Sequence, residues 1–193
     1  MCGIAGLIEL KKNHFFENKN IFKLMNNRGP DDKGFYQNKN LNYKIQLFHS
    51  RLRIIDDNTR SNQPYKFKNY VMIYNGELYN FREIKNQLKK LNYTFSTTSD
   101  TEVFIKAYDK WGEKCFEMFD GMWSVCIYDT KKDELILSRD IFGEKPLYIF
   151  KDNESLVFGS EIKYLLYLSK KKSISRVNSD HINLYLKQGY KFL

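Results

Sequence analysis

The chain has 193 residues, which is enough for one large domain or for one domain followed by a tail. Hydrophobic residues make up 42% and aromatic residues 16% of it, a composition that excludes a disordered protein. The net charge of +9 comes mostly from scattered lysines without interleaved aromatic residues, so we expect no nucleic-acid partner. No apolar run approaches the roughly 18 residues that span a bilayer, and no signal peptide is visible. We therefore expect a cytoplasmic protein that does not bind membranes.

The three cysteines, Cys2, Cys115 and Cys126, are too few and too widely spaced for a disulfide framework or a zinc site. We therefore expect no metal. Cys115 and Cys126 lie inside apolar stretches, which predicts buried and inert thiols.

The first part of the chain is predicted to be mostly strands. A buried strand over Gly3–Leu10 precedes a weakly amphipathic helix over 16–25 and a loop at Gly29-Pro30-Asp31. Two further strands are predicted over 34–37 and 43–49, and a strong one over 70–74. That last strand runs directly into Asn75-Gly76-Glu77, which we expect at a strand-to-helix junction.

Two helices have recognisable ends. Asn80-x-x-Glu83 and Ser99-x-x-Glu102 both resemble capping boxes, in which the first side chain accepts a hydrogen bond from the start of the helix. The second helix is expected to end at Gly112.

Strands are predicted again over 122–128, 135–139, 148–150 and 156–158, followed by short helices over Ile162–Leu168 and from Asp180 onward. Groups of strands separated by helices favour an α+β sandwich with helices packed outside the sheets.

The beginning of the chain, Met1-Cys2-Gly3-Ile4-Ala5-Gly6, is an unusual place for a cysteine that only packs. Removal of Met1 would give Cys2 a free α-amine, which titrates near ~7.7–8.0, beside a thiol that titrates near ~8.5. An N-terminal amine can act as the base for its own side chain, so Cys2 is a candidate nucleophile. The alternative is a small buried residue at the start of a strand.

Several motifs, taken together and in order, carry a resemblance to the class II glutamine amidotransferases, which use an N-terminal nucleophile, and more closely to the glutaminase domain of asparagine synthetases. They are Met1 to Gly6, Arg28-Gly29-Pro30-Asp31, His49-Ser50-Arg51-Leu52-Arg53-Ile54-Ile55-Asp56 with Gln63-Pro64, Asn75-Gly76-Glu77-Leu78-Tyr79-Asn80, Ser99-Asp100-Thr101-Glu102, Asp120-Gly121-Met122, Arg139 to Tyr148 and Ser160-Glu161-Ile162-Lys163. Asn27 and Glu144 depart from the family pattern but match no pocket residue.

The resemblance implies a four-layer αββα fold of the N-terminal-nucleophile hydrolase type and hydrolysis of glutamine to glutamate and ammonia. It implies Cys2 as nucleophile, with the Asn75 side chain and the Gly76 backbone N–H as the oxyanion hole. The implied glutamine-binding residues are Arg51, Ile54, Ile55, Glu77 and Asp100. The plainer readings are that Asp100 only caps its helix and that Arg51 only pairs with Asp56.

The resemblance covers residues 1–168, which we predict to be the glutaminase domain, whereas 169–193 is predicted to be a linker and the start of a synthetase domain. That domain, which would bind ATP and magnesium and amidate aspartate to asparagine, is missing from the sequence, and the glutaminase domain needs no cofactor of its own. Two alternatives remain: ammonia supply to another acceptor such as a sugar or polysaccharide precursor, and a catalytically silent module that binds a partner. The expected partners are glutamine, the synthetase domain or subunit, and a second copy in a homodimer.

The late aromatic residues are the predicted surface for docking that synthetase domain. They are Phe142, Tyr148, Tyr164, Tyr167 and Tyr185. The alternative for Phe142 and Tyr148 is that they fill the core of this domain.

Overall fold

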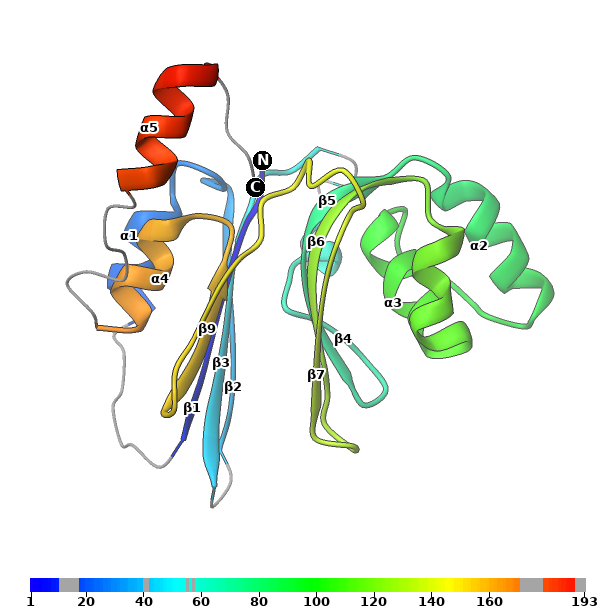
Figure 1. Ribbon diagram of the computed structural model, residues 1–193. Coiled ribbons are helices and arrows are strands. Elements are labelled where there is room, and N and C mark those ends of the chain that lie inside the picture. The colour runs from blue at the N-terminus through cyan, green and yellow to red at the C-terminus, as the bar shows by residue number, and fades with distance from the viewer. Residues whose placement is uncertain (11–17, 40–41, 55, 57, 171–178, 190–193) are drawn as a thin grey trace.

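The computed structural model describes residues 1–10, 18–39, 42–54, 56, 58–170 and 179–189. Two antiparallel sheets stack face to face, and helices cover the outer face of each, giving four layers in the order α, β, β, α (Figure 1). The predicted αββα sandwich is therefore confirmed.

The first sheet has five strands in the order β2-β3-β1-β9-β8. Their bounds are Gly3–Leu10 for β1, Asp32–Lys39 for β2, Tyr43–Arg51 for β3, Tyr148–Lys151 for β8 and Ser155–Gly159 for β9. β1 lies in the middle and pairs with β3 from Gly3 opposite Ser50 to Leu10 opposite Tyr43. This register places the beginning of β1 next to the end of β3, at one end of the strands.

The second sheet has four strands in the order β4-β5-β6-β7. Their bounds are Tyr65–Phe67 for β4, Tyr70–Leu78 for β5, Gly121–Asp129 for β6 and Glu134–Arg139 for β7. β5 and β6 pair along their full length, from Tyr70 opposite Asp129 to Leu78 opposite Gly121.

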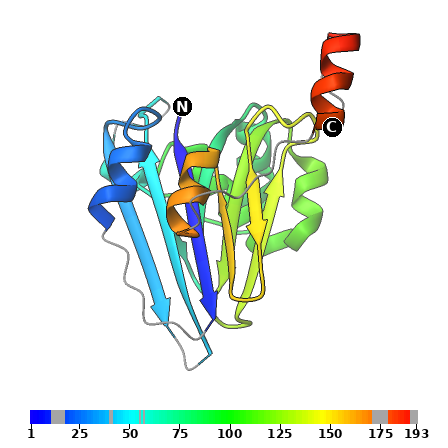
Figure 2. The ribbon, with the colours of Figure 1, turned by 60° about the vertical axis from the view of Figure 1, so that its left-hand side comes forward.

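The helices form the two outer layers. α1 (Asn18–Met25) and α4 (Ile162–Leu168) cover the first sheet, and α2 (Phe81–Lys90) and α3 (Asp100–Trp111) cover the second (Figure 2). A 3-10 helix, Gly112–Met118, follows α3, and a shorter one spans Thr59–Ser61. The last helix, α5 (Ser179–Gln188), contains no buried residue.

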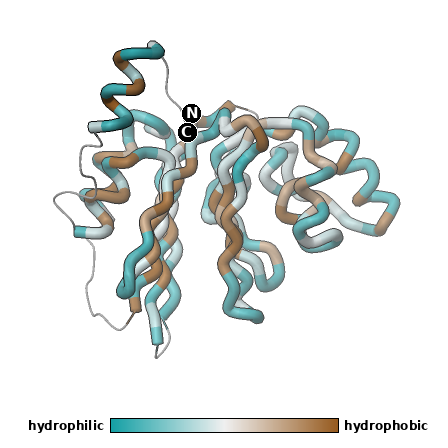
Figure 3. Tube along the Cα trace, viewed as in Figure 1, coloured by the Kyte–Doolittle hydropathy of each residue, from teal (hydrophilic) through white to brown (hydrophobic). Residues whose placement is uncertain are grey.

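Each pair of neighbouring layers encloses its own apolar core, and apolar residues accordingly follow the strands and the inner helix faces (Figure 3). The core between the sheets includes Ile4, Leu47, Ile73 and Phe158. Strand alternation explains the division, because Val71 and Ile73 of β5 face the other sheet while Met72 and Tyr74 face α3. Cys115 and Cys126 are buried, as predicted.

Three local predictions are wrong. Asn80 makes no capping hydrogen bond, because its Nδ2 donates to Met118 O at 2.9 Å and its Oδ1 accepts from Asp120 N at 3.1 Å. The Asn75-Gly76-Glu77 segment lies inside β5, since β6 continues to pair with it, rather than at a strand-to-helix junction. Tyr164 cannot belong to a docking surface, because it is fully buried between α4 and the first sheet.

The capping prediction at Ser99 is half right. Ser99 Oγ accepts from Thr101 N at 3.2 Å, as a helix cap does. Glu102 does not reach back to Ser99; it accepts from the backbone N–H groups of Ser96 and Thr97 and from Lys106.

In the described part of the chain, none of the helices has the length and apolar character that crossing a membrane requires. Among the same residues, no group of His, Cys, Asp and Glu side chains is arranged to hold a metal ion.

Candidate active site

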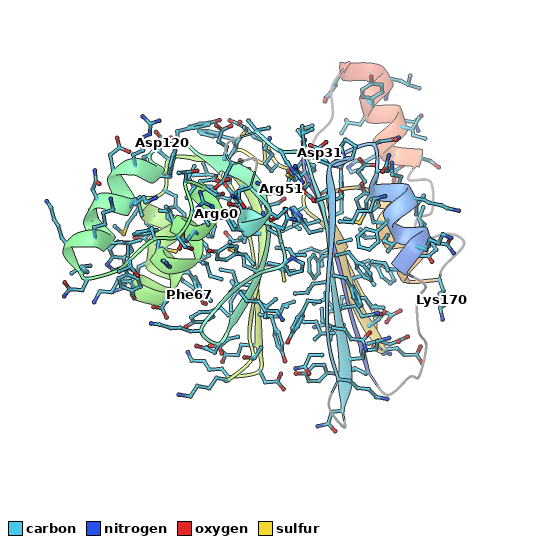
Figure 4. The ribbon with its side chains drawn as sticks, turned by 180° about the vertical axis from the view of Figure 1, so that it is seen from behind. Asp31, Arg51, Arg60, Phe67, Asp120 and Lys170 are labelled. Atoms are coloured by element: carbon cyan, nitrogen blue, oxygen red, sulfur yellow. The ribbon has the colours of Figure 1, made fainter. Side chains whose placement is uncertain are left out.

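A pocket lies at one end of the sandwich. Four segments converge there: the N-terminus, the end of β3, the end of β5 and the start of α3. Seven of the eight predicted site residues line it: Cys2, Arg51, Ile54, Asn75, Gly76, Glu77 and Asp100. The eighth, Ile55, lies outside the described residues. Residues that are up to 98 positions apart in the sequence thus meet in one place because the two sheets stack. Figure 4 shows Arg51 near this end of the sandwich.

Cys2 directly precedes β1, and its thiol lies against the backbone of Leu52. Sγ is 3.4 Å from Leu52 N and 3.6 Å from Leu52 O. Arg28 Nε donates to Cys2 O at 2.8 Å and so fixes this part of the backbone. Burial raises the pKa of the Cys2 thiol, against the opposing effects of the Leu52 N–H and the Arg51 charge. The resting thiol is therefore protonated near neutral pH and requires a base before it can act as a nucleophile.

No histidine lines this pocket in the described part of the chain. The nearby His49 is fully buried, with Nε2 3.2 Å from Tyr74 O, and burial lowers its pKa to about 3. A group with that pKa stays neutral near pH 7 and is a poor general base there. Met1 occupies the pocket mouth, where Lys145 Nζ lies 3.6 Å and Arg28 Nη2 lies 3.8 Å from its sulfur.

Asn75 carries a hydrogen-bond donor without a partner. The residue is 1% exposed, and in the described part of the chain its Nδ2 is among the few buried side-chain atoms that have no hydrogen-bond partner. Because leaving such a donor unsatisfied costs about 1–3 kcal/mol, it requires a reason. Asn75 lies two residues after Ile73 on β5, so its side chain faces the first sheet, from which Cys2 comes.

The backbone of β5 presents a second donor. Tyr74 N donates to the side chain of Gln63, and Leu78 N donates to Asp100 Oδ2, so both N–H groups point away from β6. Backbone N–H groups alternate in direction along a strand, and the Gly76 N–H therefore points the same way. Residue 76 must be glycine, because a Cβ there would lie 2.3 Å from Met122 O and 2.7 Å from the Tyr74 ring.

Asp100, the first residue of α3, places a buried carboxylate beside Glu77. Oδ2 accepts from Tyr74 Oη at 2.9 Å and from Leu78 N at 3.1 Å, and Ser99, not Asp100, caps the helix. Burial raises the pKa of Asp100, and the Glu77 charge adds to that rise, whereas its hydrogen bonds lower the pKa. Two neighbouring carboxylates in a buried pocket favour a cationic group of a ligand.

Three carbonyl oxygens, from Asp56, Asn58 and Asn62, hold the Arg51 guanidinium. Nη1 donates to Asn58 O at 2.9 Å and to Asn62 Oδ1 at 2.6 Å, and Nη2 donates to the backbone carbonyl of Asp56. Arg51 therefore does not pair with the Asp56 carboxylate, which binds Ser61 and Thr98 instead. Nη1 also lies 4.0 Å from Asp32 Oδ2, but Arg53 binds that carboxylate in two places at 2.7 and 3.0 Å, so the Arg51 guanidinium keeps positive charge available to a ligand carboxylate.

Motif reasoning did not assign a role to several other residues that line the pocket: Leu52, Gln63, Tyr74, Thr101, Met122 and Lys145. All of them except Tyr74 lie within the motifs named in the sequence analysis, and membership in a motif was the sequence signal that could have identified them. Tyr74 lies outside the motifs in an apolar strand, where a tyrosine is normally read as a core residue. Only the alternation of side chains along β5 indicates that it shares a face with Gly76.

The glutamine amidotransferase domain family matches residues 1–192. "Putative asparagine synthetase 2 (glutamine-hydrolyzing)" of Methanocaldococcus jannaschii is 36% identical over 98% of this chain and 40% of its own length. Asparagine synthetase 3 of Bacillus subtilis is 35% identical over 86% of this chain and 27% of its own length. The chain thus spans less than half the length of these curated relatives.

Among solved structures, glutamine phosphoribosylpyrophosphate amidotransferase of Bacillus subtilis, in complex with ADP and GMP, is similar with a TM-score of 0.67. The sequence identity is 20%, and the match covers 87% of this chain and 44% of that one. This similarity supports the fold assignment.

Proposed function

Because the chain belongs to the family of glutamine amidotransferase domains, we propose that it hydrolyses glutamine to glutamate and ammonia with Cys2 as the nucleophile. The observation that carries the proposal is the meeting of Cys2, Asn75, Gly76, Arg51 and Asp100 around one pocket. The ammonia is supplied to a synthetase domain that amidates aspartate to asparagine, as the names of the relatives suggest.

The reaction begins when the α-amine of Cys2, freed by removal of Met1, takes the thiol proton. The sulfur then bonds to the δ-carbon of glutamine, and the carbonyl π electrons move to oxygen. The tetrahedral intermediate collapses when its C–N bond breaks and the α-ammonium returns the proton to the departing nitrogen, which leaves as ammonia. Water, deprotonated by the same amine, cleaves the resulting thioester to glutamate and the free thiol.

The oxyanion of both tetrahedral intermediates is stabilised by the Asn75 side-chain amide and the Gly76 backbone N–H. The unpartnered Nδ2 of Asn75 supports this role, because a donor held without a partner pays no cost of breaking another bond during the reaction. Arg51 binds the α-carboxylate of glutamine, and Asp100 with Glu77 binds its α-ammonium, while Ile54 lines the remaining side.

The test is glutamine hydrolysis by the purified chain, with glutamate and ammonia both measured. We expect the two products in equal amounts and a loss of at least about 10⁴-fold in Cys2→Ala, since the nucleophile is gone. Cys126→Ala is the control, because Cys126 is buried in the core and takes no part in the pocket. Equal turnover by Cys2→Ala would overturn the assignment of the nucleophile.

The synthetase domain is proposed to dock at the loop that follows β7, next to the pocket. Ile141 is 89% and Phe142 86% exposed, and the same loop continues to Lys145 in the pocket lining. Side chains this apolar are costly to leave in water when they adjoin one another. Tyr148 and Tyr185, both partly exposed, remain candidates for the same surface.

Sedimentation of the isolated chain at several concentrations tests the docking surface. We expect self-association that Phe142→Asp abolishes without loss of glutamine hydrolysis. Leu91→Asp, at an exposed apolar position after α2, should leave the self-association unchanged. A chain that stays monomeric at every concentration would count against an apolar docking surface.

A further inference from the structure

Tyr74 lies under the pocket, and its side chain connects two groups to which the proposed reaction assigns different tasks. The residue is 2% exposed and sits in β5 directly before Asn75. Its hydroxyl donates to Asp100 Oδ2, and its ring lies where a side chain of Gly76 would otherwise be.

The hydroxyl contact restricts how Asp100 can bind a ligand. A carboxylate oxygen accepts about two hydrogen bonds, and Oδ2 already receives two, from Tyr74 Oη and Leu78 N. The ammonium of a ligand is therefore directed to Oδ1, which accepts a longer hydrogen bond of 3.4 Å from Ser99 Oγ. The backbone N–H of Thr101 also stabilises the charged Asp100 carboxylate. The orientation of Oδ1 therefore depends on the hydroxyl that is bound to Oδ2.

The ring contact places Tyr74 against the proposed oxyanion hole. The absence of a Cβ at residue 76 lets the ring pass beneath the backbone to reach α3, where it packs against Phe104 with centroids 5.0 Å apart. The backbone of Tyr74 is fixed as well, because its N–H donates to Gln63 Oε1 at 2.6 Å and its carbonyl lies 3.2 Å from His49 Nε2.

The Tyr74 hydroxyl keeps the proton that a hydrogen-bond donor needs. Burial and the adjacent Asp100 carboxylate raise the pKa of Tyr74 well above its usual value, so the hydroxyl keeps its proton at any working pH. The charged groups that face it are Asp100 and Glu77, and the thiol of Cys2 adds to the same effect.

We propose that Tyr74 is a positioning residue for substrate selection: its hydroxyl orients Asp100 toward the α-ammonium of the substrate, and its ring supports the Gly76 N–H. The inference rests on the proposed glutamine hydrolysis and adds to it a residue that selects substrates carrying a free α-amine. The competing explanation is a core tyrosine whose hydroxyl happens to find an acceptor.

The test compares two substrates in Tyr74→Phe, which keeps the ring and removes the hydroxyl. The substrates are glutamine and glutaramate, the analogue that lacks the α-amino group. For glutamine we expect kcat/KM to fall by about tenfold through KM, since Asp100 loses the hydrogen bond that orients it toward the α-ammonium. For glutaramate, which offers Asp100 no ammonium, we expect a change of less than about twofold.

Three further variants separate positioning from simple structural support. Tyr70→Phe, on the same strand beside Tyr108, is the matched control and should change neither substrate. In an Asp100→Asn background, Tyr74→Phe should have no further effect on glutamine, because the group it orients no longer carries a charge. Tyr74→Leu also removes the ring and should lower kcat, with thermal denaturation confirming that the variant folds.

The outcomes are distinguishable. If the parent chain hydrolyses glutamine, and Tyr74→Phe lowers kcat/KM by the same factor for both substrates or lowers it for neither, the inference about Tyr74 is wrong and the proposed function stands. If the parent chain does not hydrolyse glutamine, the binding of glutamate and of glutarate is measured by calorimetry instead. Tyr74→Phe should then weaken the binding of glutamate and leave the binding of glutarate unchanged. Failure of both the turnover and that binding preference overturns the proposed function and the inference together.

Discussion

The two walls of the pocket are built differently. The wall from the first sheet carries Cys2 on the chain end before β1, and its thiol touches the backbone of Leu52 at 3.4–3.6 Å. The wall from the second sheet carries Asn75, Gly76 and Asp100 on β5 and α3, where Tyr74 and Leu78 donate hydrogen bonds to Asp100 and where Asn75 and Gly76 lie within the paired part of β5. Cys2, which forms and breaks bonds, thus lies near a chain end before its strand begins (the looser wall), whereas the groups proposed to stabilise charge lie within a strand and at a helix start (the rigid wall).

The difference agrees with what the chemistry requires. A nucleophile must move by about the length of a bond as it attacks, whereas oxyanion donors work best when they are already in place and need no reorganisation. The walls belong to different sheets, so the pocket exists only when the sheets stack in register. Changes to the rigid wall should alter transition-state binding, ground-state binding or stability, and changes to the looser wall should alter the covalent step or ground-state binding.

Asn75→Ala should have the largest effect on the rigid wall. It removes one oxyanion donor and should lower kcat by roughly 10²–10³ with little change in KM. Steady-state kinetics with glutamine measures both parameters. The neighbouring Ser124→Ala is a useful control, because Ser124 is buried opposite Asn75 on β6. A rise in KM alone would contradict the oxyanion role.

Glu102→Gln should weaken the rigid wall without touching the substrate. Glu102 Oε1 lies 2.6 Å from Lys106 Nζ, and Thr97 N donates to Oε2 at 2.7 Å. Burial alone would raise the pKa of Glu102, but these partners hold it at about 2, below the ordinary 4.5. We expect the free energy of unfolding to fall by about 3 kcal/mol near neutral pH, because Lys106 loses its buried counter-charge.

The pH dependence follows from the sign of that shift. A carboxyl whose pKa is lowered by folding stabilises the protein above about pH 4.5, and this contribution is lost as the pH falls toward 2. The difference between the parent chain and Glu102→Gln in chemical denaturation should therefore shrink below about pH 4.5. Glu113→Gln, at an exposed position, should show little difference at any pH. A constant difference across this range would exclude the ion pair as its source.

Arg51→Lys and Asp100→Asn should have smaller effects, one on each wall. Both residues are proposed to bind the α-substituents of glutamine, whose contacts are similar in the ground and transition states, so KM should rise about tenfold or more while kcat changes little. Arg51→Lys retains a charge but loses the fork that binds a carboxylate in two places. A fall in kcat with unchanged KM would show that these residues act on the reaction step instead.

Sequence reasoning predicted the layers well because they rest on local patterns. The strand Gly3–Leu10 and the helix Ile162–Leu168 have the predicted bounds, since hydrophobic periodicity and turn residues mark them. β4 has only three residues, and nothing in a segment so short distinguishes it from a loop. Asn80 has the pattern of a helix cap, but its partners lie 38 and 40 residues away, beyond any local pattern.

The site was predicted by resemblance rather than by local patterns. Each motif names residues, and the structure adds their distances, their burial and the unpartnered amide of Asn75. Tyr74 could not be found in this way, because its contact with Asp100 joins residues 26 positions apart and becomes visible only when β5 lies beside the start of α3. The roles of the site residues remain predictions.

The most direct test of the account is covalent trapping with 6-diazo-5-oxo-L-norleucine, a glutamine analogue in which a diazo carbon replaces the amide nitrogen. Once that carbon is protonated, a nucleophile placed to attack the δ-carbon displaces dinitrogen from the diazo carbon and is alkylated. Mass mapping of the labelled chain gives both the alkylated residue and the state of the N-terminus. The account predicts a single adduct, on Cys2 as the first residue, with Met1 removed, and protection by excess glutamine. An adduct on Cys115 or Cys126, or full glutamine hydrolysis by a chain that retains Met1, would contradict it.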